Sequence, residues 1–598
     1  MQTNLAEPDF DVVIVGSGVA GALAAYRLAQ SNMRVLILEA GGVAPDSLGR
    51  YALVRSFIGS PTKATNSPFC GDNVLANQPF PAAPINGTDY YDYQQGYTGD
   101  QFISYYERLV GGSTWHWQGI YVRMLPNDFA METLYGKGVD WPFGYDELEP
   151  WYVAAEREMG VAGSDEERVD HRKRRYGIKY PMPALVPSYL DNKVSKAVAS
   201  APPLDEIPLR VTTVPHAINS RPYDGRAACE GFTSCVPLCP IKARYEAVFH
   251  VEKALAAGAV LRTQAVVTRL QLDESRKRVT GVHYKRWEWK EDIGKRVPLN
   301  EPEHFVTGKI IVLAANGIEN PMVLLRSNAA NASRTVGCYL MDHPIKQSYA
   351  LATEPLYPFR GPQTTSHIEV FRDGRFRQRL AAFKTSIKND GWSTNVTAAP
   401  RGNKPPAQKE ANDWHPGTLL DYVQNWGYFG DKLRDTLAHH AVRQITLNSA
   451  CEQLPIKENA ISISNNRDEL DIGRPLIEYR VDDKDGYVRQ SFKKVIELHR
   501  RVFEAMGIPA DRCKMQPDAD GARLTFGGSG HIMGTTRMGN KPENSVVDRH
   551  CRAHDQQNLY VLGSSVFPTG STANPTSTIA ALALRAADAI KRELQRHG

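Results

Sequence analysis

The sequence predicts an α/β protein of two domains, one built on a parallel nucleotide-binding sheet and the other on an antiparallel sheet. Two observations support this prediction. An apolar run at 11–15 is followed at once by a glycine-rich turn at 16–21 and then by a helical pattern. Near the other end, a second apolar run at 558–565 precedes a long helical pattern over 578–594. We therefore expect both ends of the chain to build the first domain. The length of 598 residues also exceeds what one hydrophobic core usually holds.

The glycine-rich turn has the form that the phosphates of a dinucleotide require. Residues 16–21 read G-S-G-V-A-G. Gly16 makes the tight turn, Gly18 lets the backbone approach a pyrophosphate, and Gly21 allows the helix to pack closely on the strand. The next apolar run ends at Glu39, 23 residues beyond Gly16, where a carboxylate can accept hydrogen bonds from ribose hydroxyl groups. These residues alone leave NAD and FAD open.

The far end of the chain favours FAD. The run at 558–565 has the pattern of a buried strand that ends in small residues, among them Gly563 and Ser564. A last strand that returns to the sheet of the first half fits a two-part flavin fold better than a compact NAD domain. We therefore expect a Rossmann-like FAD-binding domain with Gly563 and Ser564 close to the cofactor.

Composition and charge argue against several other classes of protein. Lys and Arg number 71 against 66 Asp and Glu, an excess too small to indicate nucleic acid as the main partner. The longest apolar runs are strand-sized, far below the roughly 20 residues of a membrane helix, so we expect no direct membrane span. Residues 1–10 lack the apolar core of an export signal, so export is expected only together with a partner.

Further motifs resemble the glucose-methanol-choline (GMC) oxidoreductases, at both ends of the chain and in several islands between. The turn at 16–21 with Glu39 matches that family's N-terminal FAD motif, and residues 108–117, R-L-V-G-G-S-T-W-H-W, are similar to its flavin-contacting loop. Residues 313–325 resemble its second signature, although Ser-Asn-Ala at 327–329 replaces the usual ending. The resemblance implies FAD binding by Gly16, Gly18, Gly21, Glu39, Gly111, Gly112, His116, Val267, Gly563 and Ser564.

The same resemblance implies a domain plan. The FAD-binding domain is expected to comprise 7–45, 100–130, 225–345 and 515–598, with a cysteine-bearing loop at 226–245. The substrate-binding domain, based on the antiparallel sheet, is expected at 131–224 and 346–514, and a lid or long loop at 46–99. Short strand-like runs at 349–351, 368–371 and 461–463 support the predicted sheet, and the charged stretch 285–295 indicates a solvated hairpin.

Two residues match the family's catalytic positions, His531 in H-I-M-G-T and Asn574 in the stretch 568–576. Oxidising an alcohol requires a base for the hydroxyl proton while hydride leaves the carbon for flavin N5, and an imidazole suits that task. Asn574 can hydrogen-bond the same oxygen and orient it. His343 lies in another family-like stretch, and we interpret it as structural or flavin-proximal. His116 resembles in position the histidine that binds flavin covalently in pyranose-oxidising relatives, which suggests an 8α-histidyl FAD.

Three cysteines crowd into one loop, Cys229, Cys235 and Cys239, with the spacing C-x5-C-x3-C. Zinc usually takes four protein ligands in a structural site, and this loop offers no fourth cysteine or histidine. An iron-sulfur cluster fits three ligands better, because sulfide completes the coordination of each iron. A reduced structural loop and a zinc site with a distant fourth ligand are the alternatives.

The cysteine spacing resembles that of the large subunits of bacterial membrane-bound dehydrogenases for fructose, sorbitol, glucose and 2-ketogluconate, a branch of the same family. This resemblance implies a 3Fe-4S cluster that passes electrons from flavin to a multihaem cytochrome c subunit. It also implies a small subunit that carries the export signal, and hence a place on the periplasmic face of the inner membrane. Without such a partner the chain would be cytoplasmic.

The expected activity is therefore FAD-dependent dehydrogenation of an alcohol of a sugar or sugar acid. Gluconate, ketogluconate, a polyol, a ketose and a glycoside all stay open as substrates. One alternative is an oxygen-using sugar oxidase, which would leave the three cysteines without a role. Another is a flavin-binding subunit without catalytic activity, which the presence of both His531 and Asn574 disfavours.

Overall fold

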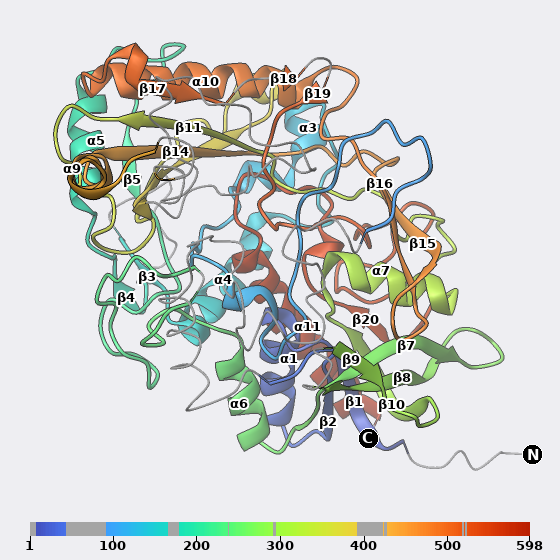
Figure 1. The fold of residues 1–598 in the computed structure, drawn as a ribbon. Coiled ribbons are helices and arrows are strands. Elements are labelled where there is room, and N and C mark those ends of the chain that lie inside the picture. Colours follow the sequence, from blue (N-terminus) through green and yellow to red (C-terminus); the bar gives the residue numbers. More distant parts are fainter. Residues whose placement is uncertain are drawn as a thin grey trace, which may run out of the picture.

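Two large sheets organise the protein, and they lie at opposite ends of the molecule in Figure 1. The structure is a computed structural model. It describes residues 8–43, 91–165, 179–236, 238–290, 295–391, 423, 427–516, 519–520 and 523–597. The predicted lid at 46–99 lies outside the described residues as far as residue 90.

The eight-stranded sheet has the order β6-β2-β1-β10-β8-β7, with β20 paired to β10 and β9 paired to β8. Strands β6, β2, β1, β10 and β20 run parallel, whereas β7, β8 and β9 form an antiparallel extension. β20 lies beside β10 although it comes from the far end of the chain, which confirms that both ends build this sheet. The bounds are β1 Phe10–Val15, β2 Val35–Leu38, β6 Val260–Arg262, β7 Ala265–Leu272, β8 Val279–Lys290, β9 Lys295–Pro298, β10 His304–Leu313 and β20 Leu559–Val561.

Helices α1 and α11 join the two ends of the chain a second time, because they pack on each other beside the parallel strands (Figure 1). α1 is rich in alanine and almost entirely buried, so that its backbone can lie close to its neighbours. An ion pair of 2.9 Å between Arg27 and Asp588 ties the two helices. Helix α6 packs on α1, and α4 packs on α11. The bounds are α1 Val19–Ala29, α4 Tyr145–Met159, α6 Val248–Ala256, α7 Asn316–Ser327 and α11 Thr576–His597.

The second sheet has six strands in the order β17-β11-β14-β13-β12-β5, and all its neighbours are antiparallel. The predicted antiparallel sheet is thus present. Helix α10 lies over one face of the sheet, beside β11 and β14, and its own apolar side is buried there (Figure 1). The bounds are β5 Val211–Thr213, β11 Ile345–Leu351, β12 Ser366–Ile368, β13 Phe383–Lys388, β14 Gln444–Cys451, β17 Cys513–Met515, α5 Tyr189–Ala199, α9 Gly430–Ala441 and α10 Tyr487–Ala505.

Two expectations about strands need correction. The run at 461–463 lies in β15, Ala460–Arg467, and among the described strands β15 pairs with β16 alone, Gly473–Glu478, in a separate two-stranded ladder. Ile461 is buried, but most side chains of β15 are exposed, as is typical of a strand outside the larger sheet. The charged hairpin is present as β8 and β9, but it is not wholly solvated, because Trp287 is buried and donates to the carbonyl of Ala40 at 2.9 Å.

The remaining elements are short. They are α3 Met131–Tyr135, β3 Ala162–Gly163, β4 Met182–Pro183, β18 Ala519–Asp520, β19 Arg523–Leu524 and a set of 3-10 turns that includes η1, Gly112–Trp115. Across the ranges that the structure describes, we find no helix of the length and apolarity that crossing a bilayer takes.

Candidate active site

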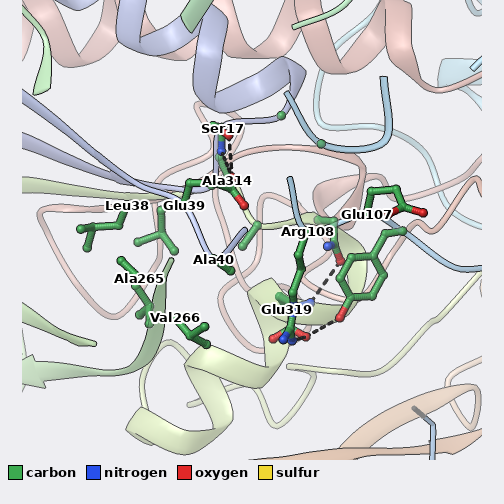
Figure 2. Close-up of a pocket in the computed structure, with 18 of the residues that line it drawn as sticks. Ser17, Leu38, Glu39, Ala40, Glu107, Arg108, Ala265, Val266, Ala314 and Glu319 are labelled. Carbon is green, nitrogen blue, oxygen red and sulfur yellow. Dashed lines mark hydrogen bonds and ion pairs between the residues drawn. The ribbon is translucent and has the colours of Figure 1, made fainter. Parts of the chain in front are cut away.

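A pocket opens where β1, β2 and β10 end, at the carboxyl edge of the parallel strands (Figure 2). Open α/β sheets bind their ligands at this edge. The pocket takes residues from segments that are far apart in the sequence. Its lining comes from 15–18, 38–40, 106–108, 112–113, 265–267, 314–316, 319 and 323.

Glycines give this pocket its backbone shape. Gly16 has φ +98°, and a Cβ there would lie 2.5 Å from the carbonyl oxygen of Ala314. A Cβ on Gly21 would lie 2.0 Å from the carbonyl oxygen of Gly16. Gly18, at the N-terminus of α1, differs, because a Cβ there would meet no described atom within 4 Å. The first two glycines are therefore needed for packing, and Gly18 leaves room for a phosphate at the helix end.

Glu39 ends β2 at the side of the pocket and is buried. Its carboxylate accepts from the backbone N–H of Ser17 at 2.9 Å, from the hydroxyl of Ser17 at 2.5 Å and from the N–H of Gly41 at 2.8 Å. Figure 2 shows Glu39 and Ser17 facing each other across the edge. Burial raises the pKa of Glu39 although these hydrogen bonds lower it. The carboxylate is thus held in place at the side of the pocket.

The other predicted FAD residues divide between two places. Gly112 and Val267 line the pocket, and Gly111 precedes Gly112 with φ +94°. Gly563 and Ser564 do not line it. Instead, the hydroxyl of Ser564 donates to the carbonyl of Ile532 at 2.6 Å, and the backbone carbonyl of Ser564 accepts from the N–H of Gly534 at 3.1 Å. Gly563 and Ser564 belong to the turn that follows β20, and Ser564 supports the loop that carries His531.

A charged pair in the pocket wall was not found by the sequence reasoning. Arg108 donates to Glu319 of α7 at 2.6 Å, and the hydroxyl of Tyr106 donates to the same carboxylate. Figure 2 shows the arginine and the glutamate meeting below the edge of the sheet. Arg108 and Arg326 hold the pKa of Glu319 below its usual range against the effect of burial. Both residues lie inside the quoted family motifs, which is the signal that could have found them.

His116 follows η1 and lies beside Glu107, with Nδ1 3.3 Å from the carboxylate. Burial lowers the pKa of His116 to about 3 and raises the pKa of Glu107 to about 8. Both shifts disfavour the charged forms, so burial weakens an ion pair between His116 and Glu107.

His531 and Asn574 lie together, as a shared catalytic role requires. Nδ2 of Asn574 is 3.1 Å from Nε2 of His531. On the other side of the ring, Nδ1 of His531 is 2.8 Å from Nδ1 of His343. Burial, then His343 and Lys384, hold the pKa of His531 well below its usual range. His531 is thus neutral at neutral pH, and a neutral imidazole can accept a proton.

Asp342 fixes the backbone of both histidines. One oxygen of its buried carboxylate accepts the N–H of His343 at 2.7 Å and the N–H of His531 at 2.9 Å. The other oxygen accepts the N–H of Ser529 at 3.0 Å and the hydroxyl of Ser104. One carboxylate therefore holds two loops, whose histidines are 188 residues apart, in one arrangement.

Lys384 reaches the same cluster from β13 and donates to Oδ1 of Asn574. Near it lie Glu369 and Arg372, which are 3.4 Å apart, and His367, whose Nδ1 is 3.5 Å from Glu369. This lysine was not predicted from the sequence. The strand pattern F-K-T-S-I-K at 383–388 contains two lysines, and nothing in it distinguishes Lys384 from Lys388.

The three cysteines pack with one another and with apolar neighbours in one small cluster. Gln363 holds their loop, because its amide both accepts from the N–H of Val236 at 2.8 Å and donates to its carbonyl at 2.7 Å. The buried guanidinium of Arg244 donates to the carbonyls of Cys235 and of Trp115 in the flavin-loop motif. Burial raises the pKa of the Cys235 thiol to about 12.

These cysteines are not in a metal-binding arrangement. Among the described residues, which include all three, no three His, Cys, Asp or Glu side chains are gathered closely enough to hold a metal ion. The donor set itself suits iron-sulfur chemistry, since thiolates are the ligands of such clusters. A buried thiol with a raised pKa loses its proton when a metal binds it.

Comparisons with known proteins agree with the geometry. Residues 208–345 and 455–583 match the GMC oxidoreductase family, and residues 11–122 match the family of FAD dependent oxidoreductases. The fructose dehydrogenase large subunit of Gluconobacter japonicus is 32% identical over 607 residues, which cover 98% of this chain and 98% of that protein. The gluconate 2-dehydrogenase flavoprotein of Pantoea cypripedii is 23% identical, with 98% of this chain and 94% of that protein covered.

The fold is also that of solved structures. Pyridoxine 4-oxidase from Mesorbium loti superposes with a TM-score of 0.60 at 20% identity, over 99% of this chain and 100% of that chain. At this identity the likeness supports the two-sheet architecture alone.

Proposed function

Because this chain belongs to the GMC oxidoreductases, FAD-dependent enzymes that act on CH–OH groups, we propose that it oxidises a hydroxyl group of a sugar or sugar acid. The observation that carries this proposal is the contact between His531 and Asn574, with 3.1 Å between the ring and the amide. The relative named as a fructose dehydrogenase large subunit, aligned along nearly the whole chain, supports a sugar as the substrate.

When bound, FAD supplies the hydride acceptor. The residues proposed to hold it are the glycine turn, Glu39 at the ribose, Gly111 and Gly112 in the flavin loop, and Val267 in the pocket wall. His531 takes the hydroxyl proton at Nε2. Asn574 holds the same oxygen, so that the carbon to be oxidised keeps its orientation. The substrate is proposed to enter from the side of 131–224 and 346–514.

His116 is proposed to bind the flavin covalently through an 8α linkage. The support is its place directly after η1, close to the Gly111-Gly112 turn, and its lowered pKa, since a ring nitrogen that bonds to the flavin must carry no hydrogen. Flavin that stays with acid-precipitated protein is the expected result. Flavin released by acid would overturn this part of the proposal.

We further propose that Cys229, Cys235 and Cys239 hold a 3Fe-4S cluster and that the electrons leave through a multihaem cytochrome c subunit. The support is the cysteine count and spacing, and the name of the relative, a large subunit. A small subunit would bring the export signal and place the complex on the periplasmic face of the inner membrane.

Iron and acid-labile sulfide in anaerobically purified protein test the electron route. We expect about three irons per chain and a paramagnetic 3Fe signal in the oxidised form, the count that three cysteine ligands suggest. Flavin without iron, together with peroxide formation in air, would favour the oxygen-using oxidase instead. Bound flavin that no sugar reduces, even with an artificial acceptor, would point to a subunit without catalytic activity.

A further inference from the structure

A buried lysine contacts the proposed catalytic pair from the antiparallel sheet. Lys384 lies on β13, and its amino group reaches across to Oδ1 of Asn574. Only 2% of the residue is exposed. The chemistry proposed above gives Lys384 no role, although burying an ammonium group is costly. Its contacts show what it can do there.

The contact with Lys384 sets the direction of the hydrogen bonds of Asn574. An ammonium group donates and has no lone pair with which to accept. Below a pH of about 7, where Lys384 is charged, the amide must therefore turn its oxygen to Lys384 and its NH2 group to Nε2 of His531, 3.1 Å away. Since that NH2 group can only donate, Nε2 must be the acceptor.

The hydrogen bond from Asn574 in turn determines which ring nitrogen of His531 carries the hydrogen. A neutral imidazole has one donor and one acceptor nitrogen, so with Nε2 as the acceptor the hydrogen lies on Nδ1. Nδ1 is 2.8 Å from Nδ1 of His343, which consequently accepts. The lysine at one end thus determines which nitrogen of His531 carries the lone pair.

We propose that Lys384 is a positioning residue: by donating to Asn574 it keeps a lone pair, and not a hydrogen, on Nε2 of His531. When the substrate binds, its hydroxyl group takes the place of the Asn574 NH2 group at this lone pair, and that NH2 group donates to the hydroxyl oxygen instead. Without that donor the amide is free to turn over. Its oxygen would then face Nε2 and stabilise the tautomer with a hydrogen there, which cannot act as a base. This inference rests on the proposed role of His531.

Charged and titratable groups face Lys384 from several elements. Burial, followed by Arg372, lowers the pKa of Lys384 to about 7, and Glu369 opposes this effect. Below that pH the ammonium charge in turn lowers the pKa of His531. Replacing Lys384 by a neutral residue should therefore raise the pKa of His531. The groups that interact electrostatically with Lys384 are Glu369, Arg372, His216, His343, His367 and His531.

The test compares Lys384→Met with Lys384→Arg and with Lys388→Met. Arginine also only donates, and Lys388 lies on the same strand but pairs with Asp390 at 3.0 Å. Anaerobic flavin reduction is followed across pH with D-fructose or D-gluconate, whichever reduces the wild-type flavin faster. For Lys384→Met we expect a rate at saturating sugar about 100-fold lower, the size of effect that misplaced catalytic groups have. We also expect the acid limb of its pH–rate profile to lie at a higher pH than in the wild type.

The controls separate positioning from general damage. Lys388→Met should keep the wild-type rate and profile, and Lys384→Arg should keep the position of the acid limb. A wild-type rate and acid limb in Lys384→Met would overturn the inference. If that variant does not fold, the nitrogen chemical shifts of histidine-labelled wild-type protein decide: a hydrogen on Nδ1 of His531 supports the inference, and one on Nε2 contradicts it.

Failure of this inference can be told apart from failure of the proposed function. If His531→Ala reduces its flavin as fast as the wild type, or neither sugar reduces the wild type, the proposed role of His531 fails and the inference fails with it. If His531→Ala is inactive while Lys384→Met behaves as the wild type, only the role of Lys384 is wrong.

Discussion

The nucleotide-binding edge and the cluster around His531 are built in different ways. At the edge, the pocket is formed mainly by the shape of the backbone, which depends on the three glycines of one short turn. The cluster is formed by hydrogen-bonded side chains from segments that are far apart in the sequence. They are His343, Lys384, His531 and Asn574. A site formed by the backbone of one turn can be recognised in a continuous stretch of sequence. A site formed by distant side chains depends on the tertiary structure.

The difference also determines how each site tolerates change. A backbone contact cannot move away without shifting the strand or helix that carries it. A side chain can turn over or be replaced while the surrounding fold survives. Substitutions at the edge should therefore affect folding and cofactor binding, and substitutions in the cluster should affect turnover with the flavin in place.

The largest effect is expected from Gly21→Ala, with Gly18→Ala as its matched control. The new Cβ of Gly21→Ala would lie 2.0 Å from the carbonyl oxygen of Gly16, so α1 can no longer pack on β1. We expect little soluble protein and almost no bound FAD. Gly18→Ala meets no described atom within 4 Å, so it should fold and bind FAD more weakly. The ratio of flavin to protein and the melting temperature measure both. Equal behaviour of the two variants would remove the distinction between packing and phosphate glycines.

Asp342→Asn should have the next largest effect, this time on turnover. The amide oxygen can still accept the N–H groups of His343 and His531, but the NH2 group would oppose the N–H of Ser529, two residues before His531. The loop that carries His531 then shifts, and displacements of about 1 Å cost about 100-fold in rate. We expect kcat to fall by that order with the flavin content unchanged. A normal kcat would show that the loops are held by other contacts.

Glu39→Gln should have the smallest effect. The two carboxylate oxygens accept the N–H groups of Ser17 and Gly41, so the amide keeps the shape but must turn its NH2 group to one of these N–H groups. The side chain also loses its charge at the proposed ribose site. Loss of one charge-assisted hydrogen bond weakens binding by about 10-fold. Fluorescence titration of the apoprotein with FAD measures it, in a His116→Ala background that cannot form the proposed covalent bond. Unchanged affinity would place the ribose elsewhere along the edge.

The sequence could predict the edge because its physical requirements act between near neighbours. The packing of Gly21 on Gly16 and the place of Glu39 at the end of β2 follow from one strand-turn-helix-strand unit. Both sheets were also predictable, the first from its two apolar ends and the second from its short alternating strands. The separate ladder of β15 was not, because alternation shows that a strand has two faces but not which sheet it joins.

The cluster could be predicted only where a family motif contained its residues. His531 and Asn574 were found in this way. Lys384 was not, because a lysine in a strand gives no sign of the neighbour that it contacts 190 residues later. His343 was interpreted as structural or flavin-proximal. Its hydrogen bond to His531 depends on the fold, because Asp342 holds the two loops together.

The most direct test of the account is anaerobic reduction of the bound flavin by D-fructose or D-gluconate, in the wild type and in His531→Ala. We predict that sugar bleaches the flavin of the wild type. The variant should keep its flavin but reduce it about 100- to 10,000-fold more slowly, the usual contribution of a general base. A variant that reduces its flavin at the wild-type rate, or a wild type whose flavin neither sugar bleaches, would contradict the assignment of sugar oxidation to this site.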